Sequence, residues 1–228
     1  MPYRTSPQTA ARKAAMRGRI LAAARRLFAA QGYDATTIQA IVQEAGTSIG
    51  NCYFYFPNKE ALLLAVAAEI LDEVSAAMDA AMARVPPGPG RAAVALYTGA
   101  ITILAQPDLA RLVLAEAAHP ALRPLAVARF TGRIRQFFAA NPALLGDRDP
   151  ALVVPAWQGT LFHVLEAALA GDVPPDGPAI GRFLARWNLQ ALGLPPAAVD
   201  AALVVLDTLA LPVPSEVPHG ADPDCRRR

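Results

Sequence analysis

Apolar residues recur at helical spacing along most of the chain, and no segment shows the strict polar–apolar alternation of a half-buried strand. Prolines and glycines divide this pattern into segments. Besides two short helices within residues 37–56, it predicts helices near residues 16–31, 58–84, 91–105, 108–118, 121–140, 151–170, 178–192 and 196–211. The sequence therefore predicts an all-α protein. The proline-rich, charged residues 212–228 are predicted to form a disordered tail.

Two short helical patterns follow the first long one, within residues 36–62. The first shows the i, i+3, i+4, i+7 spacing of one helix face, with Ile38, Ile41, Val42 and Ala45. Thr36 or Thr37 can cap its start, and Gly46 supplies the left-handed residue that ends a helix. Thr47 or Ser48 can then cap a second short helix. Two short helices around a tight glycine turn are typical of a helix-turn-helix, which favours DNA binding.

The inward face of the second short helix remains open from spacing alone. Cys52 with Phe56, and Ile49 with Tyr53, both form apolar pairs at i, i+4. Either pair can face the core.

Positive charge is concentrated in the segment that contains these helices. Residues 1–59 hold eight Lys or Arg and two acids, whereas the remaining residues hold thirteen and seventeen. A chain with a net charge of only +2 has thus separated its basic residues from its acidic ones. Such a distribution fits a polyanionic partner, although a solvated basic arm would look the same.

Other classes of protein are disfavoured. The charge-free apolar stretches 92–107 and 150–165 are shorter than the roughly 20 residues of a membrane span. The N-terminus lacks the apolar core of a signal peptide, and two cysteines make no disulfide framework. No nucleophile–base motif, phosphate loop or set of metal ligands is present in the sequence. We therefore expect a cytoplasmic protein without membrane contact, enzymatic activity, metal or cofactor.

The order of motifs over residues 17–66 resembles the DNA-binding domain of the TetR family of bacterial transcriptional regulators. The residues that carry the resemblance at fixed spacing are Gly46, Tyr53, Phe56, Asn58 and Lys59. It implies a three-helix helix-turn-helix domain over residues 12–62, with the motif at about 37–56. A long helix would join it to a ligand-binding and dimerisation bundle over residues 63–211.

The resemblance also chooses the inward face, because it places Cys52 in the core and Ile49 toward DNA. The implied DNA-binding residues are Thr37, Gln39, Thr47, Ser48, Ile49, Gly50, Asn51, Tyr53, Tyr55 and Lys59. Asn and Gln side chains can pair with adenine, whereas Ile can touch only a thymine methyl. Lys59 and the amino end of its helix would clamp a phosphate. The family often has Lys at the position of Ile49, so one cation is missing here.

Two of these positions have plainer interpretations. Tyr53 can span core and surface as part of an aromatic cluster that only packs the domain. Cys52 invites the hypothesis of a redox switch, but a lone inward cysteine is more often a small apolar residue.

The C-terminal part offers candidates for an apolar effector pocket between about residues 91 and 170. They are Tyr97, Phe130, Phe137, Trp157, Thr160, Phe162, His163 and Glu166. The aromatic members are equally compatible with a solid core, and His163 with Glu166 can instead form a pair at an interface.

The expected function is that of a ligand-responsive transcriptional regulator, a repressor released from DNA by a small, largely apolar effector. Double-stranded operator DNA would be bound by a homodimer on a near-palindromic site. The helices near 151–170 and 178–192 carry continuous apolar surface and are predicted to form the dimer interface. The alternative is an all-α ligand carrier or enzyme with a basic N-terminal domain, which the charge distribution disfavours.

Overall fold

The computed structural model describes residues 7–114 and 119–209, which form ten α-helices and one short 3₁₀ helix without a strand. The all-α prediction is confirmed. The helices are α1 Pro7–Ala35, α2 Ile38–Ala45, α3 Ile49–Tyr55, α4 Lys59–Met82, α5 Pro89–Leu104, α6 Pro107–Leu114, α7 Leu122–Ala140, α8 Pro150–Ala170, α9 Gly177–Ala191 and α10 Pro196–Thr208, with the 3₁₀ helix at Pro142–Leu144. The predicted ends near residues 118 and 211, and the predicted tail, lie outside the described residues.

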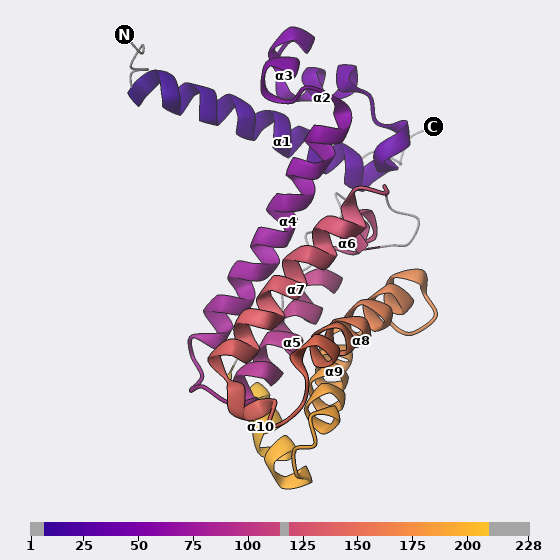
Figure 1. Cartoon of the computed structure of the whole chain (residues 1–228). Helices are drawn as coiled ribbons and strands as arrows, with labels where there is room; N and C mark the ends of the chain where they lie inside the picture. Colours follow the sequence, from indigo (N-terminus) through magenta and orange to yellow (C-terminus); the bar gives the residue numbers. More distant parts are fainter. Residues whose placement is uncertain (1–6, 115–118, 210–228) are drawn as a thin grey trace.

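Helices α1–α3 form a small N-terminal domain above the bundle, with the amino end of α4 completing it (Figure 1). Thr37 caps α2, and its hydroxyl accepts from the Ala40 N–H, which resolves the choice between the two threonines. Gly46 ends α2 in the left-handed conformation, at φ 64°. Ser48 then caps α3. The local sequence therefore determines the turn directly.

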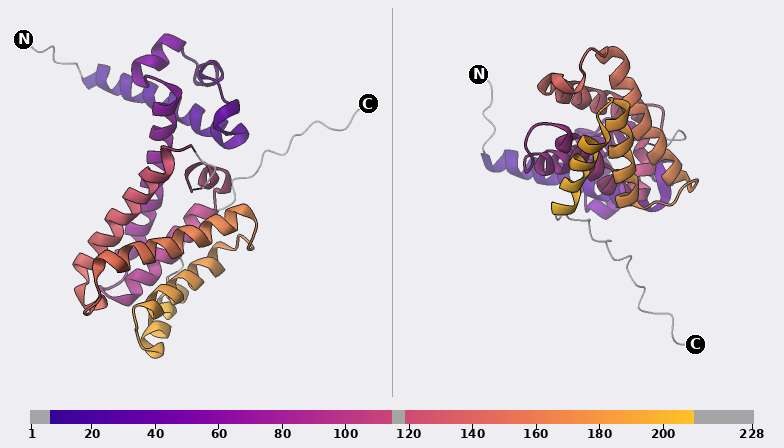
Figure 2. Two further views of the ribbon diagram at one scale, coloured as in Figure 1. Left: turned by 45° about the vertical axis from the view of Figure 1, so that its right-hand side comes forward. Right: turned by 90° about the horizontal axis from the view of Figure 1, so that it is seen from below.

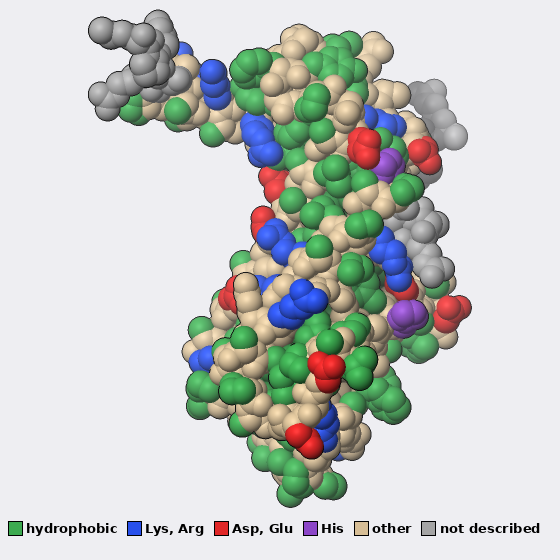
Figure 3. Space-filling model, viewed as in Figure 1, with side chains coloured by type: hydrophobic (Ala, Val, Ile, Leu, Met, Phe, Trp, Pro, Cys, Tyr) green, Lys and Arg blue, Asp and Glu red, His purple; other side chains and the backbone are tan. Residues whose placement is uncertain are grey.

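Helix α1 is longer than its apolar pattern predicts, because it begins at Pro7 rather than near Met16. Residues 7–15 are exposed and rich in alanine and basic residues, which favour helix without any buried face. This half of α1 projects from the domain and carries Lys and Arg side chains (Figure 3). Gly32, at φ 78°, interrupts α1 near its carboxyl end, directly after residue 31, where the apolar pattern predicts the helix to end.

Helix α4 runs from the N-terminal domain into the bundle beside α7 (Figures 1 and 2). Within the bundle, α5 packs against α4, α9 and α10. The contact with α9 is close because a Cβ on Gly181 would lie 2.9 Å from the Tyr97 Cα. Tyr97 thus belongs to the α5–α9 interface.

Helix α8 is long and apolar enough to cross a membrane, judged by length and composition among the described residues. Its apolar residues Leu161, Phe162 and Leu165 are nevertheless buried against neighbouring helices. The apolar length of α8 is therefore accounted for, at least in part, by packing within the bundle.

Candidate functional site

Helix α3 presents an uncharged surface of mixed polar and apolar side chains. Cys52 is fully buried and Phe56 is 3% exposed, whereas Ile49 and Tyr53 are 45% and 48% exposed. The inward pair is therefore Cys52 with Phe56, and the alternative left open by spacing is wrong. Tyr53 does not belong to the buried core, in contrast to the plainer interpretation of it as a packing residue.

The other predicted DNA-binding residues surround these two exposed positions. Thr37, Gln39, Ser48 and Gly50 are exposed, while Thr47, Asn51 and Tyr55 are half-buried. The Asn51 Nδ2 donates to the Thr47 hydroxyl at 2.7 Å, which holds the amide in one orientation. Its Oδ1 and second N–H remain able to meet a base edge. A Cβ on Gly50 would meet no atom within 4 Å, so this position is open to a ligand's close approach.

Positive charge reaches this surface from α1. The Lys13 ammonium lies 5.5 Å from the Phe54 ring centroid, and the Arg17 guanidinium lies 5.1 Å from that of Phe56. These two cations therefore flank α3, which has no charged residue of its own. The charge asymmetry of the sequence predicted a basic surface for a polyanionic partner. The structure places α1 beside α3 and so assigns Lys13 and Arg17 to that surface.

Lys59 has a structural role besides the predicted phosphate contact. Its ammonium donates to the carbonyls of Tyr33 at 2.9 Å and Thr36 at 3.0 Å, and it lies 4.1 Å from the Tyr33 ring centroid. These contacts fasten the start of α4 to the end of α1. One of its three donors remains for a phosphate.

Cys52 is buried, and desolvation raises the pKa of its thiol. The protonated thiol is the unreactive form, so the geometry favours a packing role over a redox switch.

Two cavities lie deeper in the protein along α4. The first, which we call the α4–α6 cavity, has about 390 Å³ of space between α4, α5, α6 and α7, part of it open to solvent. Its walls include Ile70, Glu73, Val74, Gln106, Val113 and Phe130. The second, the α4–α8 cavity, has about 490 Å³, also partly open, with walls that include Met78, Met82, Phe130, Arg133, Phe137 and Trp157.

Three of the predicted pocket residues, Phe130, Phe137 and Trp157, line the α4–α8 cavity. Phe162 supports Phe130 through an edge-to-face contact at 5.5 Å. The structure thus brings the aromatic candidates of α7 and α8 together.

The remaining candidates lie elsewhere. Tyr97 packs under Gly181, Thr160 bonds Asn188 of α9 at 3.0 Å, and the exposed His163 lies 2.9 Å from a carbonyl of its own helix. Glu166 forms an ion pair with Arg123 of α7 and none with His163 is found among the described residues. The i, i+3 spacing of His163 and Glu166 shows that both lie on one side of the helix. It does not show which neighbouring helix packs against that side.

Met78, Met82 and Arg133 also line the α4–α8 cavity and were not predicted from the sequence. Methionine and arginine at helical spacing carry no signal that separates a cavity wall from ordinary packing. Among the described residues, no group of His, Cys, Asp or Glu side chains is placed to hold a metal ion.

The N-terminal domain matches known regulators in sequence. The family model "Bacterial regulatory proteins, tetR family" matches residues 20–66. The HTH-type transcriptional regulator YuxN of Bacillus subtilis, itself uncharacterised, is 49% identical over 21% of this chain and 16% of its own length. RutR of Escherichia coli is 45% identical over 23% and 25%. The transcriptional repressor Rv1474c of Mycobacterium tuberculosis is 41% identical over 28% and 34%. The chain thus spans at most about a third of these three relatives' lengths.

Solved structures extend the likeness to the bundle. A TetR/AcrR-family regulator of Thermobifida fusca is 26% identical, with a TM-score of 0.55 over 76% of this chain and 96% of its own. RolR in complex with resorcinol is 22% identical, with a TM-score of 0.62 over 90% and 98%. The fatty acid degradation regulator FadR of Bacillus halodurans is 19% identical, with a TM-score of 0.63 over 75% and 97%. The last two show the fold alone. Residues 20–66 thus match the DNA-binding domain of the tetR family of bacterial regulatory proteins, and the described helices as a whole have the fold of solved regulators of the TetR/AcrR family.

Proposed function

We propose that the protein is a ligand-responsive, DNA-binding transcriptional regulator that acts as a repressor. The observation that carries the proposal is the uncharged, exposed face of α3 flanked by Lys13 and Arg17. A face of this kind can enter a major groove while cations beside it meet phosphates. The sequence relatives, which include a transcriptional repressor, support this assignment.

Sequence readout is assigned to the side chains that face outward from α2 and α3. Gln39 and Asn51 suit adenine edges, and Ile49 suits a thymine methyl. Gly50 permits a close approach to the DNA. Contacts to the sugar–phosphate backbone are assigned to the hydroxyl-bearing positions and to cations, namely Thr37, Thr47, Ser48, Tyr53, Tyr55, Lys59, Lys13 and Arg17.

A homodimer through α8 and α9 is the second part of the proposal. Leu152, Phe183 and Trp187 are exposed on these helices, and the rings of Phe183 and Trp187 stack at a centroid distance of 5.9 Å. Exposed aromatic pairs of this kind are typical of interface cores. A two-fold dimer would present two α3 helices to the two halves of a near-palindromic operator.

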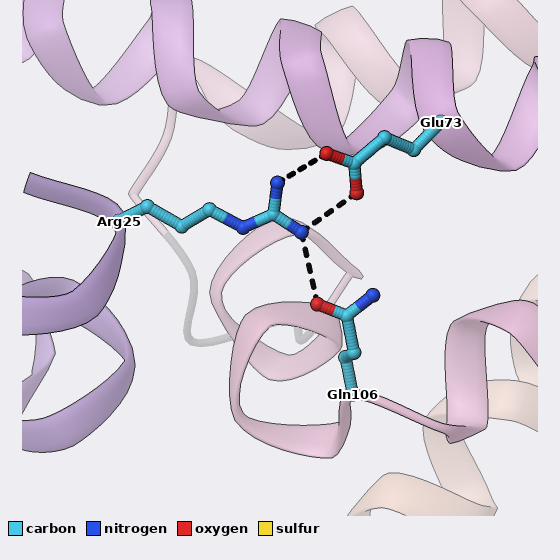
Figure 4. Close-up of polar contacts among 3 residues, drawn as sticks. All are labelled: Arg25, Glu73 and Gln106. Carbon is cyan, nitrogen blue, oxygen red and sulfur yellow. Dashed lines mark hydrogen bonds and ion pairs between the residues drawn. The ribbon is translucent and has the colours of Figure 1, made fainter. Parts of the chain in front are cut away.

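Coupling between effector and DNA is assigned to a contact between the two domains. Arg25 of α1 forms an ion pair with Glu73 of α4, with Nη2 at 2.7 Å from Oε2, and also donates to the Gln106 Oε1 at 2.9 Å (Figure 4). Glu73 and Gln106 both line the α4–α6 cavity. An effector that moves either residue would therefore displace α1, and with it the α2–α3 surface.

The ion pair with Glu73 stabilises the charged form of Arg25. The hydrogen bond to Glu73 is the largest of the causes that raise the pKa of Arg25, and desolvation opposes it only in part. The Arg25 side chain is 22% exposed and that of Glu73 is 48% exposed. Partly buried, bidentate pairs are less screened by salt than pairs at an open surface.

The competing function is that of an all-α ligand carrier or enzyme. The relatives are regulators rather than enzymes, and a carrier has no use for cations around an exposed α3. Fluorescence anisotropy with duplexes from the DNA flanking the gene separates the two functions. We expect saturable, salt-dependent binding to one duplex and weaker binding to scrambled DNA. Equal, weak binding to all duplexes at every salt concentration would favour the carrier.

A further inference from the structure

The two cavities lie in line along one face of α4. Ile70 and Val74 line the α4–α6 cavity, while Met78 and Met82 line the α4–α8 cavity. These four residues occupy successive i, i+4 positions, so the row extends over about 18 Å of helix. The two cavities therefore follow one another along α4 and share Phe130 as a wall residue.

The partition is the side chain of Phe130, which borders both cavities. It is buried and held edge-to-face by Phe162 on the far side. A rotation of this one ring would join the two spaces, and the flexible methionines of α4 can adjust to what enters.

One polar group points to how a ligand would be fixed in the α4–α8 cavity. Arg133 is the only charged residue among those that line it. Its two Nη atoms donate to the Asp79 carboxylate at 2.6 and 3.2 Å, whereas its Nε is buried and has no hydrogen-bond partner among the described residues. A buried donor without an acceptor is unfavourable, and an oxygen placed in the cavity would satisfy it.

The charge of Arg133 is already balanced by Asp79. A carboxylate in the cavity would have to compete for the guanidinium and lose its hydration between apolar walls. An uncharged oxygen needs only the one free N–H. The chemistry of the cavity thus favours a neutral acceptor over an acid.

We propose that the effector is an elongated, apolar molecule with an uncharged oxygen acceptor, an alcohol or a ketone, at one end. Its oxygen binds the Arg133 Nε, and its chain runs along α4 past Phe130 into the α4–α6 cavity. The far end of the chain then presses on Glu73 and Gln106, the partners of Arg25. This inference rests on the proposed effector-responsive function and specifies its ligand.

The head group is tested by calorimetry on the full-length protein without DNA, with decanol, decanoate and decane as probes. We expect decanol to bind more tightly than either of the others. Arg133→Lys keeps a positive charge opposite Asp79 but has no N–H at the Nε position. It should weaken decanol about tenfold, as expected for one buried hydrogen bond, and leave decane unchanged.

Chain length is tested with hexanol and tetradecanol. Both should bind, but only the longer one should reach Glu73 and release labelled operator DNA in an anisotropy assay. Phe130→Leu, which replaces the ring between the two cavities with a smaller side chain, should raise the affinity for tetradecanol relative to that for hexanol. Circular dichroism melting curves of both variants verify that each one folds.

Three results would overturn the ligand assignment: no binding of any probe, equal affinity for decanol and decane, or an Arg133→Lys variant that binds decanol like the wild type. The same preparations are assayed for DNA binding without probe. If the protein still binds DNA, the ligand assignment is refuted but the proposed regulatory function is not. Loss of DNA binding in the unliganded wild type would instead refute the proposed function.

Discussion

At the scale of single residues, the proposal assigns Asn51 to a base edge, and the structure fixes the orientation of its amide. Thr47 holds its amide, so the group is oriented before DNA arrives. Asn51→Ala should cost about 1–3 kcal/mol of operator binding and relax the preference at one base position. Anisotropy with a set of operators substituted one base pair at a time measures this. A uniform loss on every operator would show that Asn51 does not read a base.

Cys52 allows a prediction of reactivity. Because burial raises the pKa of its thiol, the group stays protonated at neutral pH and is shielded from reagents. In a Cys225→Ser background, we expect Ellman's reagent to label the unfolded protein but not the native one. Rapid labelling of the native protein would restore the hypothesis of a redox switch.

The same shift has a consequence for stability, with a definite sign. A folded-state pKa above the unfolded value means that the contribution of Cys52 is fully present below the ordinary thiol pKa, about 8.5, and is lost as pH rises through the folded value. Urea unfolding should therefore show a larger alkaline loss of stability in the wild type than in Cys52→Ala.

At the scale of elements, the sequence predicts those features, such as helix caps, that depend on residues close together in the chain. The caps Thr37, Ser48 and Asn58 bond their own helices three residues on, so helix starts could be located without a structure. The start of α1 was predicted wrongly, because its first turns are solvent-exposed and have no apolar face. Arg25 and Glu73 lie 48 positions apart, and nothing local marks them as partners.

Lys59 shows why an assignment by motif needs the structure. Lys59→Ala removes two hydrogen bonds from the start of α4, one to Tyr33 of α1 and one to Thr36 just after it, so it should lower the free energy of unfolding by about 1–3 kcal/mol as well as weaken DNA binding. Lys13→Ala, on the exposed part of α1, is the matched control. It should reduce the salt dependence by about one unit of slope without affecting stability. Urea titration and salt-dependent anisotropy measure the two effects. Unchanged stability of Lys59→Ala would argue against the structural role.

The Arg25 contact makes a separate prediction about coupling. Arg25→Met keeps much of the aliphatic length of the side chain but loses Glu73 and Gln106 as partners. We expect the variant to bind operator DNA in the absence of effector. The ratio of operator affinities without and with effector should fall toward one. Arg26→Met is the control, because Arg26 pairs with Glu44 inside the N-terminal domain. Equal coupling in both variants would exclude Arg25 from the route.

At the scale of the whole molecule, the surfaces assigned to the three proposed tasks, which are DNA binding, effector binding and dimerisation, lie in different parts of the fold. The α3 surface lies at one end, the cavities lie along α4, and α8 and α9 form an outer side of the bundle (Figure 2). The resemblance predicted this layout, yet it did not place the cavities, because they depend on which side chains leave space between four helices. Three aromatic candidates were found by composition alone, whereas Arg133 required the structure.

In the proposed dimer, two α3 helices would together read a complete operator, whereas one α3 would read only half of it. Trp187 and Phe183 are half exposed, and Arg186 beside them forms an ion pair with Asp200. A partner would therefore cover these apolar rings without burying Arg186 as an unpaired charge. Trp187→Arg should therefore give a monomer in light scattering at micromolar concentration, because burying an unpaired cation in an apolar interface is costly. The monomer should lose most of its operator affinity, since each half-site alone offers only one α3. Val204→Glu, an equally exposed apolar position on α10, should remain dimeric. A wild type that is already monomeric, or a Trp187→Arg variant that remains a dimer, would place the interface elsewhere.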